Sequence, residues 1–357
     1  MLTAPAPRDY SLTGPENQRA GARGLADAEW YTCMIPRSRL KELMQRRDGP
    51  AIRDTLLWFA LLIITGTIGC LTWGTWWTIL PFMAYGVLYG SCSDSRWHES
   101  LHRTAFKTVW MNDALYELAS FMVLRESVPW RWSHTRHHTD TIIVGRDPEI
   151  AVPRPPDFLG LALSLFSLKS GPREFRRMAL HVFGRLTPGE ATYIPETERP
   201  KVYRNARIYL AIYLAVIATA VATRSFLPLM LVGFPSFYGA WLLLVFGLTQ
   251  HAGLAEDVLD HRLNCRTVYM NPVLRYLYWE MNYHVEHHMF PLVPYHALGH
   301  LHQELKADMP VPYDGLWAAY REIIPTLLRQ AKDPAYHVQR RLPASARALG
   351  SNPQPAT

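Results

Sequence analysis

The chain has few cysteines and lacks the short motifs that bind common redox cofactors. Its 357 residues contain four cysteines, and no two of them form a C-x-x-C pair. This spacing excludes an iron–sulfur cluster, a C-x-x-C-H haem attachment site and a disulfide framework. No G-x-G-x-x-G segment for a flavin or nicotinamide dinucleotide is present either. Scattered cysteines of this kind are typical of a reducing compartment.

Two long stretches of the chain are almost free of charge. Residues 56–90 contain no Asp, Glu, Lys or Arg, and residues 205–250 contain only Arg207 and Arg224. A membrane span needs about 20 apolar residues, so each stretch has the length of two spans joined by a turn. Gly233 and Pro235 interrupt the last span, which membrane helices tolerate. The alternative is a pair of buried hairpins in a soluble protein, but charge-free runs of this length are rare in soluble cores.

Lys and Arg residues indicate how these stretches are oriented. Six of them precede the first stretch within residues 37–53, and residues 93–204 are rich in Arg, whereas the two expected turns hold only Arg224. Basic residues favour the cytoplasmic side, so both termini and the middle segment are predicted to be cytoplasmic, in the cytoplasmic (inner) membrane. The net charge of +7 is therefore a topology signal, and some of it faces membrane lipid. No nucleic-acid motif accompanies it, so nucleic-acid binding is excluded.

We predict an all-α integral membrane protein with four transmembrane helices in two hairpins. The spans are expected at residues 54–73, 75–92, 206–223 and 227–249, and residues 93–204 and 250–310 form a cytoplasmic helical cap. Together these segments make one domain, residues 35–310. A flexible tail, residues 1–34, is expected before this domain. A cytoplasmic helix, residues 311–332, and a disordered tail, residues 333–357, are expected after it. The N-terminal fifty residues lack the pattern of a signal peptide.

Eight histidines fall in three short boxes on the predicted cytoplasmic side. The boxes read His98-Glu-Ser-Leu-His102, His134-Thr-Arg-His137-His138 and His284-Val-Glu-His287-His288. Residues three and four apart share one face of a helix, so each box aims two or three imidazoles at one point. Imidazole binds iron, zinc, copper and nickel. Eight converging imidazoles exceed the four ligands of a tetrahedral zinc and favour two metal ions side by side.

The boxes allow two other interpretations. The first box alone fits H-E-x-x-H, the motif of a zinc metalloprotease with Glu99 as general base. Two further H-x-x-H-H segments have no role in a protease with one zinc ion. The second interpretation treats the histidines as a solvated basic surface or as core residues. Three boxes beside the ends of predicted spans disfavour both.

The residues around the third box extend the pattern. They read Asn282-Tyr-His-Val-Glu-His-His-Met-Phe-Pro-Leu-Val-Pro294. With the order of boxes and hydrophobic stretches, this chain resembles the membrane-bound histidine-box fatty acid desaturase/hydroxylase superfamily over about residues 56–305. The resemblance implies four membrane helices under a cytoplasmic di-iron cap, and so agrees with the layout expected from hydropathy.

The resemblance also implies an activity. It points to a fatty acid desaturase that uses two iron ions (Fe2+/Fe3+), with O2 as co-substrate, to form a C=C bond in an acyl-lipid, acyl-CoA or acyl-ACP. The alternative is a hydroxylase or other monooxygenase of the same superfamily, acting on a lipid, a hydrocarbon or a smaller molecule.

The resemblance also adds a candidate ligand outside the boxes. His251, which follows the fourth predicted span, is the ninth candidate, and its alternative role is to support another ligand or to cap a helix. Gln250 is a weaker candidate ligand. The expected metal ligands are His98, His102, His134, His137, His138, His251, His284, His287 and His288.

The surroundings of the site give further expectations. Because the cofactor motifs are missing, electrons must come from a separate protein, a ferredoxin, rubredoxin or cytochrome b5 with its reductase. The hypothetical docking site for this carrier is a basic face formed by Arg125, Arg131, Arg136, Arg173, Arg176 and Arg177.

Carboxylates near the boxes are candidates to orient the imidazoles. They are Asp94, Glu99, Asp140, Asp147, Glu280 and Glu286. Asp147-Pro-Glu149 also resembles the acidic element that follows the second box in the superfamily. Three tryptophans either line a substrate tunnel or form an interfacial belt: Trp73, Trp76 and Trp77. His181, His261 and His337 are not assigned.

Overall fold

The computed structural model describes residues 8–344 and 346, and the chain over this part is mostly helical, as the sequence predicts. The only sheet in this described part is a parallel pair, β1 (Val268–Tyr269) and β2 (Tyr313–Asp314). The last part of the predicted disordered tail, residues 345 and 347–357, lies outside the described residues.

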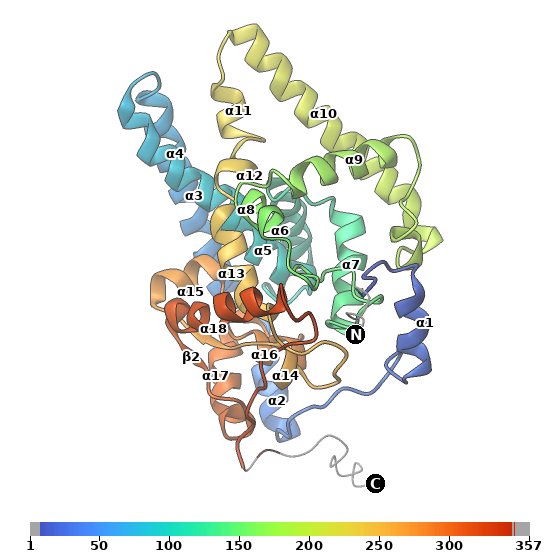
Figure 1. Ribbon diagram of the computed structural model, residues 1–357. Helices are drawn as coiled ribbons and strands as arrows, with labels where there is room; N and C mark the ends of the chain where they lie inside the picture. Colours follow the sequence, from blue (N-terminus) through green and yellow to red (C-terminus); the bar gives the residue numbers. More distant parts are fainter. Residues whose placement is uncertain (1–7, 345, 347–357) are drawn as a thin grey trace.

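Two helical hairpins project from a body of shorter helices (Figure 1). The first consists of α3 (Asp48–Leu71), the 3-10 turn η1 (Trp76–Thr78), α4 (Ile79–Gly86) and a π-helical turn η2 (Val87–Ser91). The second consists of α10 (Arg199–Thr223), α11 (Leu227–Leu231), α12 (Pro235–Tyr238) and α13 (Trp241–His251). Large apolar side chains on the projecting parts are exposed, with Leu71 at 81% and Val221 at 73%. Exposed apolar surfaces of this kind are typical of sites that contact lipid or another protein.

Two of the four expected spans are continuous helices. The segments Arg37–Leu71 and Glu196–Thr223 are long and apolar enough to cross a membrane, and only 28% and 17% of their most apolar windows are buried. A core helix of a soluble protein would be mostly buried, so this exposure favours lipid contact. Of the other two expected spans, 75–92 is helical without a gap from Trp76 but changes from 3-10 to α to π geometry. The span 227–249 is divided into shorter helices, with breaks next to Gly233, whose φ is 94°, and Pro235. Four complete spans therefore stay a prediction.

The body is built from helices on both sides of the second hairpin in the sequence. Before that hairpin come α5 (Cys92–Leu101), α6 (Val109–Met122), α7 (Ser127–Thr139), α8 (Phe158–Ser164), α9 (Ser170–Val182), η3 (Glu190–Thr192) and η4 (Glu196–Glu198). After it come α14 (His261–Asn264), α15 (Pro272–Tyr278), α16 (His284–Met289), α17 (Tyr295–Leu305), η5 (Lys306–Asp308) and α18 (Gly315–Gln330). Figure 1 shows α5, α7, α13 and α16 near the middle of this body.

A buried arginine joins the first hairpin to the body. Arg96 on α5 is fully buried, and its guanidinium lies 5.0 Å from the ring centres of Trp58 and Trp279 and 5.4 Å from that of Tyr276. Its Nη1 also donates to the carbonyl of Cys92 at 2.9 Å. Aromatic faces attract a guanidinium by about 0.5–2 kcal/mol each. The contacts hold α5 between α3 and α15 and fix the direction in which the first histidine box points.

The N-terminal segment, for which the sequence predicts a flexible tail, contains a helix and contacts the body of the protein. Residues 8–34 include α1 (Pro15–Ala22), and α2 (Arg37–Leu43) follows. Arg8 and Arg23 form ion pairs with Asp257, and Arg8 also pairs with Glu256 at 3.0 Å. These partners lie more than 230 positions away in the sequence, so composition alone gave no sign of them. At the other end, the Val338 amide donates to the Gly253 carbonyl at 3.0 Å, within the predicted disordered tail.

A buried ionic network fixes α9 to the start of α7. His181 is fully buried, with Nδ1 2.6 Å from Glu126 and Nε2 3.1 Å from Glu190. Arg177 and Glu174 complete the network beside Glu190. Burial opposes a charge on the imidazole, but hydrogen bonds and attraction from the two carboxylates outweigh it and raise the pKa of His181 to about 9.

This network predicts a loss of stability at high pH. A histidine whose pKa rises on folding stabilises the protein fully below its unfolded pKa of about 6.5, and this contribution disappears as pH passes the folded pKa. Between pH 6 and pH 9.5 the melting temperature of the protein should therefore fall about 2 °C more than that of a His181→Asn variant. Thermal unfolding of both proteins in detergent measures this. Equal decreases would mean that His181 carries no charge in the folded state.

Candidate metal centre

Nine histidines converge in two groups inside the body. In one group, five imidazoles have ring nitrogens within 4.8 Å of one another: His98, His102, His134, His138 and His287. In the other, four meet the same limit: His137, His251, His284 and His288. All nine expected ligands are included, the ninth candidate among them. The structure thus brings together every histidine that the sequence nominated for metal binding.

The second and third boxes each divide between the two groups. On α7, His134 and His138 are four residues apart and enter one group, while His137 turns to the other. On α16, His284 and His288 enter the second group and His287 the first. Residues four apart lie on nearly the same side of a helix, whereas a neighbour is rotated by about 100°. The prediction that each box aims its imidazoles at one point is therefore wrong for the second and third boxes, because α7 and α16 each contribute histidines to both groups.

The two groups are in direct contact. The rings of His138 and His288, one from each group, stack with centroids 4.3 Å apart. Within the first group, Nε2 of His138 lies 3.1 Å from Nε2 of His134 and 3.2 Å from Nε2 of His287. Within the second, Nε2 of His284 lies 2.9 Å from that of His251 and 3.0 Å from that of His288. Nitrogens about 3 Å apart suit neighbouring ligands on one ion with bonds of about 2.1 Å.

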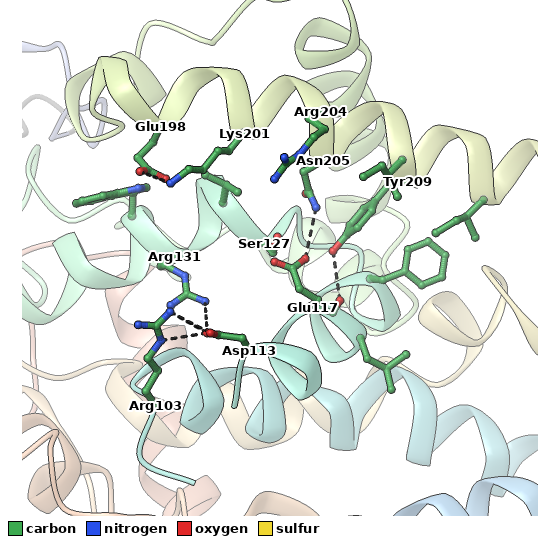
Figure 2. Close-up of a pocket in the computed structure, with 16 residues that line it drawn as sticks. Arg103, Asp113, Glu117, Ser127, Arg131, Glu198, Lys201, Arg204, Asn205 and Tyr209 are labelled. Carbon is green, nitrogen blue, oxygen red and sulfur yellow. Dashed lines mark hydrogen bonds and ion pairs between the residues drawn. The ribbon is translucent and has the colours of Figure 1, made fainter. Parts of the chain in front are cut away.

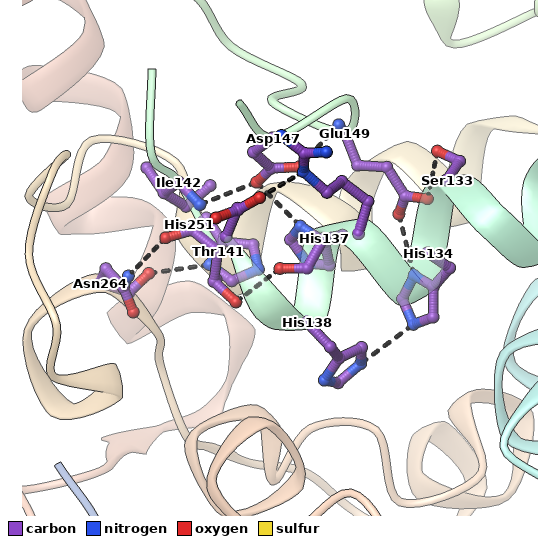
Figure 3. Close-up of polar contacts among 12 residues, drawn as sticks. Ser133, His134, His137, His138, Thr141, Ile142, Asp147, Glu149, His251 and Asn264 are labelled. Carbon is purple, nitrogen blue, oxygen red and sulfur yellow. Dashed lines mark hydrogen bonds and ion pairs between the residues drawn. The ribbon is translucent and has the colours of Figure 1, made fainter. Parts of the chain in front are cut away.

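Three acceptors on the far side of the rings from the groups fix the protonation of three imidazoles. Nδ1 of His137 lies 2.8 Å from Asp147, and Nδ1 of His134 lies 2.9 Å from Glu149 (Figure 3). Nδ1 of His251 lies 2.8 Å from the Asn264 carbonyl. These oxygens accept, so each Nδ1 carries the proton and each Nε2 presents a lone pair to its group. Such partners behind metal ligands set the tautomer and raise the basicity of the ligand.

His288 is held in the same tautomer by a threonine. The hydroxyl of Thr141 donates to the carbonyl of His137 at 2.7 Å and lies 3.2 Å from Nδ1 of His288. Its proton is used for the carbonyl, so the oxygen accepts from Nδ1. The Nε2 lone pairs of His251 and His288 therefore both point at Nε2 of His284, which has one proton to give at most. A cation between them resolves this conflict.

Several ring nitrogens in the groups have no hydrogen-bond partner among the described residues. They are buried, and they include both nitrogens of His98, Nε2 of His102 and Nδ1 of His284. Buried polar atoms without partners are rare in folded proteins, because each costs about 1–3 kcal/mol. Orphaned nitrogens on residues that otherwise converge are expected of a site that holds metal. The donor set therefore fits metal ions.

The environment keeps most of these imidazoles neutral. Burial lowers the pKa of His102 and His251 to about 3, and neighbouring positive groups contribute to the decrease. Burial and mutual repulsion lower the pKa of His98, His134, His138, His284, His287 and His288 far below 6.5. His137 is the exception: burial opposes its charge, but Asp147 raises its pKa. Neutral imidazole is the form that binds metal.

Of the six carboxylates that the sequence nominated as supports, only Asp147 contacts a histidine of the groups. Asp94 pairs with Arg125, Asp140 with Arg136 and Arg146, and Glu280 with Arg275. Glu286 contacts His302 and Thr267, and Glu99 accepts from the Tyr295 amide at 3.0 Å. Glu149, the third residue of the Asp147-Pro-Glu149 element, supplies the second supporting carboxylate. Proximity in the sequence was thus a poor guide, and the acidic element after the second box was a good one.

One further histidine lies beside the groups. His261 is buried, its ring stacks on Trp30 with centroids 4.3 Å apart, and its centroid is 5.2 Å from that of His288. With Cys265 and His288 it forms a third cluster of candidate donors. No box surrounds His261, and the one local sign is its four-residue spacing from Cys265. Gln250 binds the Tyr278 hydroxyl at 2.7 Å and is in neither group.

The chain is similar to a known protein family over most of its length. The sequence profile of the family described as Fatty acid desaturase matches residues 72–320, which is more than half of the chain. The Delta(5) fatty acid desaturase fat-4 of Caenorhabditis elegans is 27% identical over 248 residues. The match covers 60% of this chain and 55% of that protein, so the chain spans little more than half of the relative's length. The resemblance carried by the histidine boxes is thereby confirmed: this chain belongs to the fatty acid desaturase family.

Proposed function

We propose that this protein is a membrane di-iron oxidoreductase that uses O2 to introduce a C=C bond into an acyl chain. The observation that carries the proposal is the pair of touching histidine groups, with five and four converging imidazoles. Two ions side by side need two such groups, and family membership supports desaturation as the reaction. The substrate class is an acyl-lipid, acyl-CoA or acyl-ACP.

The nine histidines of the two groups would hold the irons. When bound, the iron pair supplies O2 activation and removal of hydrogen from an unactivated C–H bond. The chain orients the ligands through Asp147, Glu149, Thr141 and Asn264. It also restricts water, because six of the nine side chains are buried; His102, His138 and His251 are partly exposed. These three mark the accessible sides of the site.

The protease alternative gains no support from Glu99. A general base must reach a water on the metal, but the Glu99 carboxylate accepts from the Tyr295 amide and is fully buried. Burial raises its pKa to about 7. His98 and His102 belong to a group of five imidazoles, more than a single catalytic zinc uses.

We further propose four membrane spans, with both termini and the histidine groups on the cytoplasmic side of the inner membrane. The family is membrane-associated, and the exposed apolar faces of α3 and α10 support insertion of both hairpins. Trp76 and Trp77, 87% and 75% exposed, lie at the tip of the first hairpin. This position favours an interfacial belt over the lining of a tunnel.

Electrons would come from a soluble carrier, as the missing cofactor motifs imply. The proposed basic docking face is smaller than expected, because four of its six arginines have carboxylate partners: Arg125, Arg131, Arg136 and Arg177. Arg173 and Arg176 on α9 are exposed. They are the part of this face most available to an acidic carrier.

Product analysis tests the proposed reaction. Cells that express the chain with a ferredoxin and its reductase should accumulate acyl chains two mass units lighter than the parent, because two hydrogens are lost. Mass spectrometry of total lipids and thioesters measures this, with cells expressing a His287→Ala variant as the control. A product heavier by one oxygen would show a hydroxylase instead.

Substitution of one histidine in each group tests the metal assignment. His137→Ala and His287→Ala should each lower bound iron below about two ions per chain and reduce activity at least 100-fold, because each variant removes one ligand from one of the two groups. His300→Ala, at an exposed histidine outside both groups, is the matched control and should retain both irons. Iron content by mass spectrometry and circular dichroism are the measurements. Full iron in either ligand variant would contradict the assignment.

The supporting carboxylates predict an intermediate effect. Asp147→Asn should weaken iron binding about 10–100-fold, because an amide can present its N–H to Nδ1 and so no longer fixes the tautomer of His137. Asp140→Asn is the control, since within the described part of the chain the Asp140 carboxylate pairs with Arg136 and Arg146 and forms no hydrogen bond with a histidine of the groups. Iron retention during titration with a chelator distinguishes the two. Equal retention would mean that the carboxylate of Asp147 is not required for orientation.

A further inference from the structure

A groove of about 830 Å³ lies between α6, α7 and α10, outside the metal centre. None of the nine histidines of the two groups lines it. Figure 2 shows α10 along one side and α6 and α7 facing it, with charged side chains gathered toward one end. The groove is therefore a second concave site on this chain, and the proposed reaction does not use it.

The side of α10 that faces the groove changes from charged to apolar along its length. Glu198, Lys201 and Arg204 line one end, and Ile208 and Ile212 line the other. These residues are spaced by three or four, so they share one face of the helix, and they span about 20 Å at 1.5 Å per residue. Leu118 and Phe121 on α6 continue the apolar part. A ligand that fills the groove must be charged at one end and apolar at the other.

The charged end carries an excess of positive charge. Its cations are Arg103, Arg131, Lys201 and Arg204, and its carboxylates are Asp113, Glu117 and Glu198. Arg103 and Arg131 share a single partner, Asp113, at 3.0 and 3.8 Å. Among the described residues no carboxylate pairs with Arg204, which is exposed. Four cations against three anions leave a site that attracts a negative head.

The apolar end lies on a helix that is suited to contact lipid. α10 belongs to the segment Glu196–Thr223, which is apolar and long enough to cross a membrane, and Ile208 and Ile212 are 49% and 38% exposed. Basic pockets between membrane helices on the cytoplasmic side are suited to anionic lipid heads. In a bilayer, the charged head group of a lipid already lies at the membrane surface and its acyl chain in the apolar interior, as the two ends of the groove require. A soluble thioester or peptide would have to bring its apolar part into the membrane first.

We propose that this groove binds one anionic phospholipid of the bilayer, with its phosphate at Arg103, Arg131 and Arg204 and an acyl chain along Ile208 and Ile212. The lipid would join α10 to α6 and α7 and so connect the membrane part of the protein to the body. Its binding needs neither metal nor turnover. The test is therefore independent of the proposed reaction.

Native mass spectrometry of the full-length protein in detergent tests the site. With equal amounts of dioleoyl phosphatidylglycerol and dioleoyl phosphatidylcholine, one phosphatidylglycerol per chain should be retained in preference to phosphatidylcholine. Arg204→Glu should lower the apparent affinity for phosphatidylglycerol about tenfold or more, because a positive charge becomes negative and no ion pair among the described residues is lost. Arg207→Glu is the matched control on the same helix, since Arg207 is exposed and does not line the groove. It should change the affinity less than twofold.

A second variant addresses the apolar end. Ile208→Trp fills the chain-binding part and should lower retention of the dioleoyl lipid without altering the charged end. Equal retention of the two lipids by the unaltered protein, or equal effects of Arg204→Glu and Arg207→Glu, would overturn the proposal. Displacement of phosphatidylglycerol by oleoyl-CoA at the same concentration would also overturn it, because the occupant would then be a soluble thioester.

Discussion

Nine imidazoles packed against one another in a largely buried site are the constraint on which this structure depends. Without a cation, Nε2 atoms of neighbouring rings lie about 3 Å apart with too few protons to pair them all. Several buried ring nitrogens also have no hydrogen-bond partner among the described residues. Protonation of the rings does not supply the missing protons, because burial lowers the pKa of most of the imidazoles far below neutrality. Metal ions satisfy the lone pairs and supply the missing positive charge at once. The fold is therefore suited to bind two metal ions, and the surrounding helices place the ligands.

The scaffold around the histidines fixes each contributing helix by a different interaction. The Arg96 guanidinium, between three aromatic rings, holds α5. Asp147 and Glu149 hold the rings of α7 from behind, and the Asn264 carbonyl holds His251 at the end of α13. The N-terminal segment pairs with Glu256 and Asp257, in the loop after His251. A site of this kind needs ligands placed within a fraction of an ångström, and these distant contacts supply the placement.

Local spacing was enough to predict the residues of the site but not their grouping. The i, i+3 and i, i+4 intervals identify the eight box histidines, because helical geometry alone places them on related faces. How His137 and His287 divide from their neighbours depends on where α7 and α16 lie relative to each other, which no interval records. His261 has no box, and the partners of Arg8 lie almost 250 positions away. The helical class and two helices long and apolar enough to cross a membrane followed from hydropathy. Gly233 and Pro235 also marked the interruption of the last predicted span, whereas no sequence signal marked the π-helical turn.

The central claim is that the two histidine groups hold two iron ions. Anomalous X-ray scattering from crystals of protein loaded with iron, collected above and below the iron edge, tests it most directly. The account predicts two iron peaks, one among His98, His102, His134, His138 and His287 and one among His137, His251, His284 and His288. A single peak, or scattering at the zinc edge alone, would contradict it.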